Sequence, residues 1–204
     1  MALRRGFKSE ATALASELRH ELGLSPLDRL DPFALATHLD VQVLPLTNLT
    51  ATCTEAEHFI TAEPEAFSAL TVFEGHRRII VHNDTHSPPR QHSNIAHELG
   101  HCVLHHTPVP ALDPLTGCRN YRSEHEQQAD WMAGELLVTR PMALATARGR
   151  FTFSDALRRL IVSPKMLNWR MNVTGARAQA ERERNNGTRT STRGTAWRAK
   201  GHTQ

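Results

Sequence analysis

Two histidines four residues apart, His97 and His101, enclose a glutamate in the pattern His-Glu-x-x-His. The stretch around them, NIAHELGHCVLHH, is typical of a helix, which we expect over about residues 92–106. At about 3.6 residues per turn, both imidazoles then lie on one face and can reach a single metal ion, whereas Glu98 lies about 100° away around the helix. The spacing therefore provides two metal ligands and a separate carboxylate that can act as general base.

A hydrolytic zinc site needs a third protein ligand and keeps one position open for water. The stretch EHEQQADWMAGELL predicts another helix, over about residues 124–138. Glu126 on this helix offers a carboxylate, and Asp130, four residues later on the same face, can hydrogen-bond a ligand histidine. Glu124 is the rival ligand, but it points about 200° away from Glu126 and has no acidic residue four positions later. We therefore favour Glu126 as the third ligand of one Zn²⁺. A tetrahedral site with two imidazole ligands suits zinc better than it suits manganese or iron.

Other interpretations of the histidines stay open. Paired histidines also occur on exposed helix faces, and zinc can be purely structural, although structural sites usually have four protein ligands and no fourth is evident. Peptide hydrolysis further needs a hydrogen-bond donor to the developing oxyanion, for which Tyr121, His125 and His105 are candidates. We otherwise expect His105 and His106 to be solvated at the end of the helix, where a positive charge favours the helix dipole.

The elements that position these residues are mainly helical. We expect helices over residues 9–22 and from Asp31, a proline-rich loop over residues 107–123, and a helix-turn-helix spacing with helices starting at Ser154 and Pro164. A small sheet is expected from the strands VQVLP, HFITA, SALTVF and RRIIVH, the last two joined by a hairpin at Gly75. The Pro88-Pro89 pair predicts a break in the chain after the last strand.

The net charge of +3 is unevenly distributed. After Gly175 there are seven basic residues and two acidic ones, so the rest of the chain is net negative. The basic tail therefore gives no evidence that the folded part binds nucleic acid.

The composition also favours a cytoplasmic protein. No stretch approaches the roughly 20 uncharged apolar residues that span a bilayer, and Glu10 and Glu17 occupy the segment where a signal peptide is apolar. Cys53, Cys102 and Cys118 match no disulfide framework, and we expect reduced thiols. We expect no membrane partner.

Several stretches together resemble the ImmA/IrrE family of zinc-dependent endopeptidases. The likeness is carried by RQHSNIAHELGHCVLHH and EQQADWMAGELL, and extends to RRGFKSEATALASELRHELGL, LDPFALATHL and VSPKMLNWRMNVTG, most of residues 4–175. The resemblance implies an α+β, zincin-like core similar to the thermolysin-like clan. It also implies that His97, His101 and Glu126 bind zinc and that Glu98 is the catalytic base. Members are intracellular and cleave helix-turn-helix (Xre-type) repressors, which relieves repression of mobile elements or stress genes.

We therefore expect a metallopeptidase domain over residues 1–150, helix-turn-helix-like helices over 151–175 and a disordered basic tail over 176–204. The expected function is cleavage of a helix-turn-helix repressor; the alternative is a non-catalytic regulatory protein that captures a repressor or DNA. The second terminal helix, PKMLNWRMNV, is mostly apolar, with only Lys165 and Arg170 basic. A helix that reads a DNA groove needs more polar contacts, so a packing or substrate-docking function is favoured.

Overall fold

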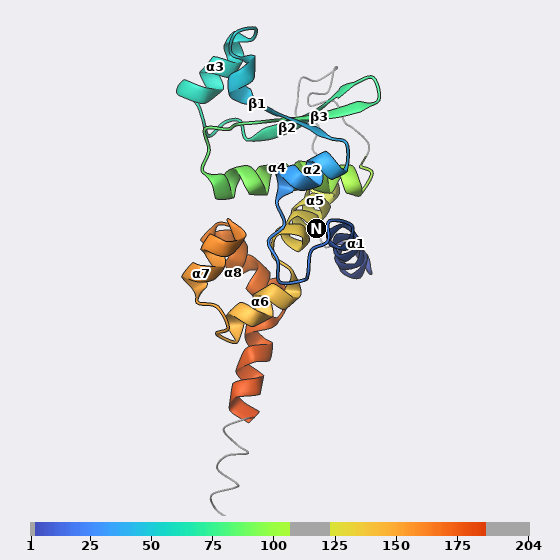
Figure 1. Ribbon diagram of the computed structural model, residues 1–204, viewed down its shortest axis with the longest axis vertical. Coiled ribbons are helices and arrows are strands. Elements are labelled where there is room, and N and C mark those ends of the chain that lie inside the picture. Colours follow the sequence, from blue (N-terminus) through green and yellow to red (C-terminus); the bar gives the residue numbers. More distant parts are fainter. Residues whose placement is uncertain (1–2, 107–122, 187–204) are drawn as a thin grey trace, which may run out of the picture.

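A three-stranded sheet lies on one side of helix α4, and helices α1 and α5 and the C-terminal helices lie on the other side (Figure 1). The computed structural model describes residues 3–106 and 123–186. The fold is α+β, as the sequence predicts, and is mainly helical with one small sheet. In chain order the described elements are α1 (Phe7–Glu21), α2 (Pro32–His38), β1 (Gln42–Pro45), a 3-10 turn (Leu46–Leu49), α3 (Thr54–Thr61), β2 (Ala69–Glu74), β3 (Arg77–His82), α4 (Pro88–Val103), α5 (Ser123–Leu137), α6 (Arg140–Ala147), α7 (Phe153–Leu160) and α8 (Pro164–Val173).

The sheet has the strand order β1-β3-β2, in which β3 pairs parallel with β1 and antiparallel with β2. The predicted hairpin joins β2 to β3, and its Gly75 adopts a φ of 61°, which glycine reaches without steric cost. The central strand β3 buries Ile80 and Val81. This order leaves β2 at the edge of the sheet, where it contacts α4.

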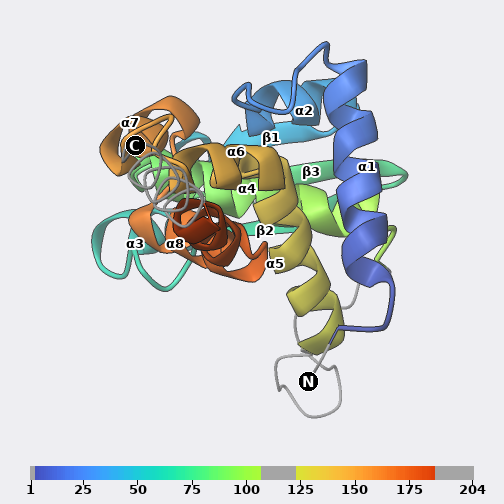
Figure 2. The same cartoon turned by 90° about the horizontal axis from the view of Figure 1, so that it is seen from below.

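The main core forms where α4 and α5 pack against each other and against α1, which runs alongside α5 (Figure 2). Ile95 and Leu99 of α4 and Met132 and Leu136 of α5 are fully buried. In each helix these two positions are four residues apart, which places them on one apolar face. Within the described residues, no helix is both long enough and apolar enough to cross a membrane.

Two local predictions are wrong. The first four residues of HFITA belong to helix α3 and Ala62 caps its C-terminus. So short a run does not distinguish a strand from a helix, and Glu55 and Glu57 in the first turn favour the helix N-terminus. The Pro88-Pro89 pair does not break the chain but starts α4, about four residues before the predicted start. The first N–H groups of a helix have no intrahelical partner, so proline costs nothing there.

The C-terminal helices share a core with α5. Leu160 of α7 and Leu167 of α8 lie in one buried cluster with Ala133 and Leu137. The predicted disorder after residue 175 is wrong for residues 176–186, which form a helix. Alanine, arginine, glutamine and glutamate in this stretch are strong helix formers, and one face is anchored by the buried Ala176 and Ala180. The rest of the tail, and Cys118 in the predicted loop, lie outside the described residues.

Candidate metal centre

Helices α4 and α5 are in tight contact at Gly100, inside the His-Glu-x-x-His pattern. A Cβ atom built on Gly100 lies 3.0 Å from the carbonyl oxygen and 3.2 Å from the Cα atom of Ala129. Any larger residue would therefore push the helices apart. This contact sets the separation between the two histidines of α4 and the glutamate of α5.

Gly100→Val is expected to lower the free energy of unfolding by about 1–3 kcal/mol, because it overpacks this contact. It is also expected to weaken zinc binding about tenfold, because the ligands are no longer held at their spacing. The matched control is Gly134→Ala, whose Cβ would meet Trp169 at 2.4 Å and so strain the contact between α5 and α8 instead. Chemical unfolding and chelator competition measure both effects. Unchanged zinc affinity in Gly100→Val would contradict this assignment.

The three predicted ligands converge between α4 and α5. The Nε2 atoms of His97 and His101 are 3.2 Å apart, and they lie 3.2 Å and 3.5 Å from Oε2 and Oε1 of Glu126, respectively. At metal–ligand distances of about 2.0–2.1 Å, corners of a tetrahedron lie about 3.3–3.4 Å apart. The two nitrogens and the carboxylate therefore fit three corners of a zinc site. Within the described part of the chain, no other set of three His, Cys, Asp or Glu side chains brings its ligand atoms close enough together to hold a metal ion.

Two acidic side chains near the three candidate ligands, Asp130 and Glu124, make different contacts. Asp130 lies 2.9 Å from Nδ1 of His97, on the side of the ring opposite the other candidate ligands. Glu124 is not part of the cluster, and its carboxylate accepts a hydrogen bond from Gln128. The predicted arrangement of Glu126 and Asp130 along one face of α5 is thus observed, and the rival Glu124 is turned away.

The cluster is electrostatically prepared for a cation. Burial by itself lowers the pKa of His97, but its contacts with Asp130 and Glu126 outweigh burial and raise that pKa to about 10. Hydrogen bonds from His101 and His97 hold the pKa of Glu126 well below its usual range. In the metal-free protein, a proton on His97 therefore supplies the positive charge at this site. A metal ion that binds here must displace that proton.

Two buried histidines outside the cluster make the fold sensitive to acid. Burial lowers the pKa of both His82 and His92, whose rings meet Phe33 edge-on. The unfolded chain, with a pKa near 6.5, therefore takes up protons first, and the contribution of each ring to stability is lost as the pH falls below about 6.5. The pKa of His97 is raised instead, so its contribution to stability is lost as the pH rises. That contribution is already complete below about pH 6.5 and does not change in the acid range.

We expect the free energy of unfolding of the metal-free protein to fall between pH 6.5 and 5.0, by at most about 1.4 kcal/mol per ring and pH unit. Urea unfolding at both pH values measures this. A protein carrying His82→Gln and His92→Gln should show a flatter dependence over the same interval. An equal slope in the two proteins would assign the acid sensitivity to other groups.

The predicted base, Glu98, is held by a residue that the sequence did not identify. The hydroxyl of Thr71 on β2 donates a hydrogen bond of 2.6 Å to Oε2 of Glu98. This contact ties the carboxylate to the edge strand and leaves Oε1 available. Thr71 gave no signal because a threonine in a strand is ordinary, and its contact depends on how the sheet packs on α4.

The three candidate oxyanion donors have different positions. His105 is exposed and adopts a φ of 52°, and no contact joins it to the ligand cluster within the described residues. His125 stacks on His106, with ring centroids 4.2 Å apart. His106 itself is buried, so the expectation that it is solvated is wrong. Tyr121 lies outside the described residues.

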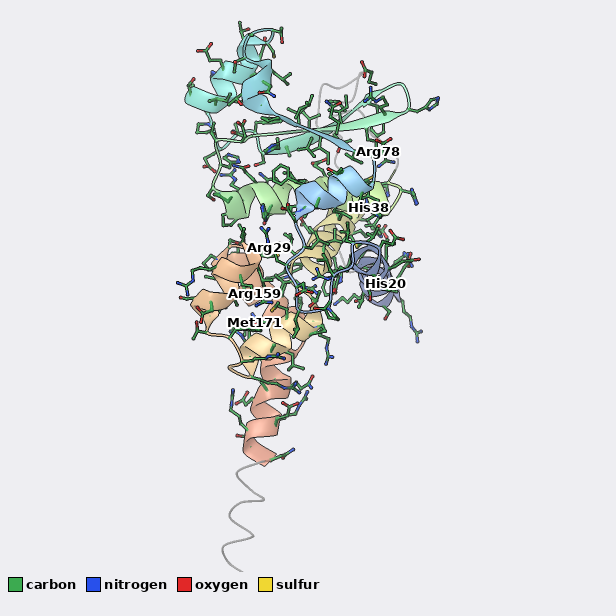
Figure 3. The ribbon with its side chains drawn as sticks, in the orientation of Figure 1. His20, Arg29, His38, Arg78, Arg159 and Met171 are labelled. Carbon is green, nitrogen blue, oxygen red and sulfur yellow. The ribbon has the colours of Figure 1, made fainter. Side chains whose placement is uncertain are left out.

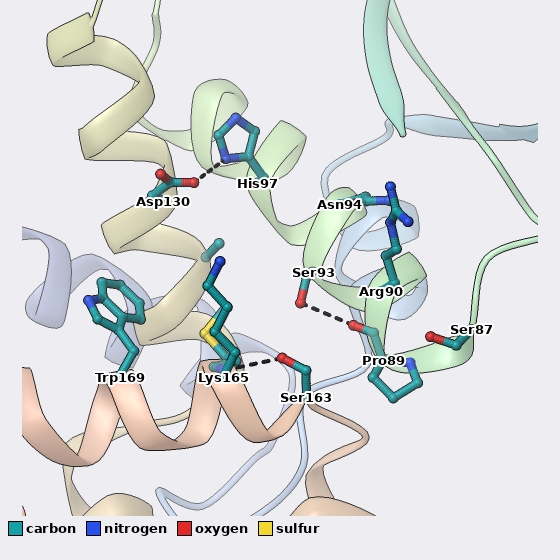
Figure 4. A pocket seen from close by; sticks show the side chains of 12 residues that line it. Ser87, Pro89, Arg90, Ser93, Asn94, His97, Asp130, Ser163, Lys165 and Trp169 are labelled. Atoms are coloured by element: carbon teal, nitrogen blue, oxygen red, sulfur yellow. Dashed lines mark hydrogen bonds and ion pairs between the residues drawn. The ribbon is translucent and has the colours of Figure 1, made fainter. Parts of the chain in front are cut away.

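A pocket of about 800 Å³ opens beside His97 (Figure 4). One wall is the N-terminal half of α4, and the other includes Lys165, Met166 and Trp169 of α8. Asp130 also lines it. Because Arg170 is fully buried, Lys165 is the one basic residue of α8 outside the core, and it points into this pocket. Helix α8 therefore packs into the core through Leu167 and also forms one wall of this pocket.

Comparison with known proteins gives one match that covers this region. The family model described as the IrrE N-terminal-like domain, a peptidase domain, matches residues 57–172, more than half of the chain. The match begins within α3, covers β2, β3, α4 and α5, and ends in the last turn of α8. No match to a curated protein was found. The chain therefore belongs to the ImmA/IrrE family and is a metallopeptidase.

Proposed function

We propose that this protein is a zinc-dependent endopeptidase in which His97, His101 and Glu126 hold the metal and Glu98 is the general base. The observation that carries the proposal is the spacing of the two Nε2 atoms and the two carboxylate oxygens of Glu126, 3.2–3.5 Å, which matches a tetrahedral zinc site. The fourth corner is left for water or substrate, as in hydrolytic rather than structural sites.

When bound there, zinc supplies Lewis acidity toward the scissile carbonyl and lowers the pKa of the attacking water. Glu98 accepts the proton of that water through Oε1 and passes it to the leaving amine. Thr71 keeps the carboxylate in one orientation through its hydrogen bond to Oε2. Asp130 holds His97 by its Nδ1–H, which leaves Nε2 free to ligate.

The proposed substrate is a helix-turn-helix transcriptional repressor in the cytoplasm, cleaved to relieve repression. Family membership supports a protein substrate, and the resemblance of the sequence to repressor-cleaving members supports this class. The pocket beside His97 is large enough for a substrate side chain next to the cleaved bond. Lys165, Met166 and Trp169 of α8 would contact that side chain.

A substrate trap tests this proposal. Tagged Glu98→Gln protein captures partners from cells, and wild-type protein with zinc is then added while the partner is followed by intact mass. A helix-turn-helix repressor that is cut by the wild type and left whole by the variant is the expected result. His97→Ala, which lacks a ligand, is the control for cleavage by contaminants. A captured partner that zinc-loaded wild type never cuts would favour the non-catalytic binding protein instead.

A further inference from the structure

His106 lies just past the end of α4, but the chain turns it back onto the metal centre. The left-handed conformation of His105, with a φ of 52°, reverses the chain, and the N–H of His106 donates to the carbonyl oxygen of His101. Non-glycine residues rarely adopt this conformation, and such strain is often retained at functional sites. The turn leaves the His106 side chain 9% exposed.

A chain of hydrogen bonds starts at the second ligand and runs away from the metal. Nδ1 of His101 lies 2.9 Å from Nδ1 of His106, and Nε2 of His106 lies 2.9 Å from Oε1 of Gln128. The amide of Gln128 then donates to Glu124 at 3.2 Å. The four side chains come from the last turn of α4 (His101), the turn just past it (His106) and the first half of α5 (Gln128 and Glu124).

When the rings of His101 and His106 are both neutral, only one arrangement of protons satisfies all three contacts. The carboxylate of Glu124 accepts, so Gln128 presents its amide nitrogen to it and its Oε1 to His106. Nε2 of His106 must therefore donate, and Nδ1 of the neutral ring must accept. His101 is then the donor through Nδ1–H, which leaves the lone pair of Nε2 directed toward His97 and Glu126.

We propose that His106 is a positioning residue for the metal centre: it selects the tautomer of His101 that ligates through Nε2. This inference rests on the metal site of the proposed function. Asp130 serves the first ligand in the same way, but with an ionised side chain that is 68% exposed. His101 thus has a neutral, buried partner, whose ring is held from one side by stacking on His125.

His106→Phe tests the proposal, because it keeps an aromatic ring against His125 and removes the acceptor. We expect about 10- to 100-fold weaker zinc binding, as for other partners of ligand histidines, measured by chelator competition. His106→Gln, which restores a carbonyl acceptor, is expected to recover part of the loss. The control is the same change at an exposed histidine of α1, His20→Phe, which should bind zinc like the wild type (Figure 3).

The smallest expected loss, tenfold, corresponds to about 1.4 kcal/mol of binding free energy. Zinc affinity of His106→Phe within about twofold of wild type would therefore overturn the proposal. Should that variant fail to fold, the tautomers in zinc-loaded wild type decide. Long-range ¹H–¹⁵N spectra of the histidine rings should show Nδ1–H at His101 and Nε2–H at His106, and Nδ1–H at His106 would overturn it. Wild-type protein that binds no zinc would contradict the proposed function itself, which separates the two failures.

Discussion

Glu98→Gln protein is expected to bind zinc as tightly as wild type and to cleave its substrate about 10²- to 10⁴-fold more slowly. The amide has the size of the carboxylate and can still accept the hydrogen bond from Thr71, but it cannot take a proton from water. The loss should appear in kcat rather than in KM, because the group acts on the reacting water and not on the bound peptide. Metal content by mass spectrometry and kcat with the captured substrate measure the two quantities.

The matched control is Glu17→Gln on the exposed face of α1, which should leave both quantities unchanged. Full activity in Glu98→Gln would remove Glu98 from the mechanism. Loss of zinc from that variant would instead make Glu98 part of the ligand set, which the cluster of His97, His101 and Glu126 does not require.

Arg170→Met is expected to lower the free energy of unfolding by about 3–5 kcal/mol. Arg170 is fully buried, forms an ion pair of 2.7 Å with Glu135 and donates to the carbonyl oxygen of Val138. Its guanidinium also lies over the rings of Trp131 and Trp169. Removing it leaves a buried carboxylate without its partner, so the melting temperature should fall by roughly 6–20 °C in a domain of this size.

A double variant distinguishes the ion pair from lost packing. Arg170→Met combined with Glu135→Met removes both charges, and much of the stability should return because no unpaired charge stays buried. Arg148 and Glu183 form a pair at the same distance of 2.7 Å, but their side chains are 49% and 44% exposed. Arg148→Met should therefore have a much smaller effect. Equal losses in the buried and exposed variants would contradict the burial argument.

Much of the fold and part of the site could be predicted because they depend on local spacing. The four-residue interval places His97 and His101 on one helix face, and the same interval relates Glu126 to Asp130 on another helix. The hairpin at Gly75 follows from glycine between two β-branched runs. The failures are also local: a segment as short as HFITA, with three apolar residues among five, fits the period of a strand or of a helix, and Pro88 is compatible with a helix start.

The sequence by itself thus determined which side chains share a face of each helix, because backbone geometry converts spacing into direction. Only the tertiary structure decided which faces meet. Gly100 against Ala129 sets the separation of α4 and α5, and the packing of β2 on α4 brings Thr71 to Glu98. His106 reaches His101 through a left-handed turn that no periodicity predicts. Contacts between distant segments depend on how whole elements pack, and residue spacing within one element carries no information about that.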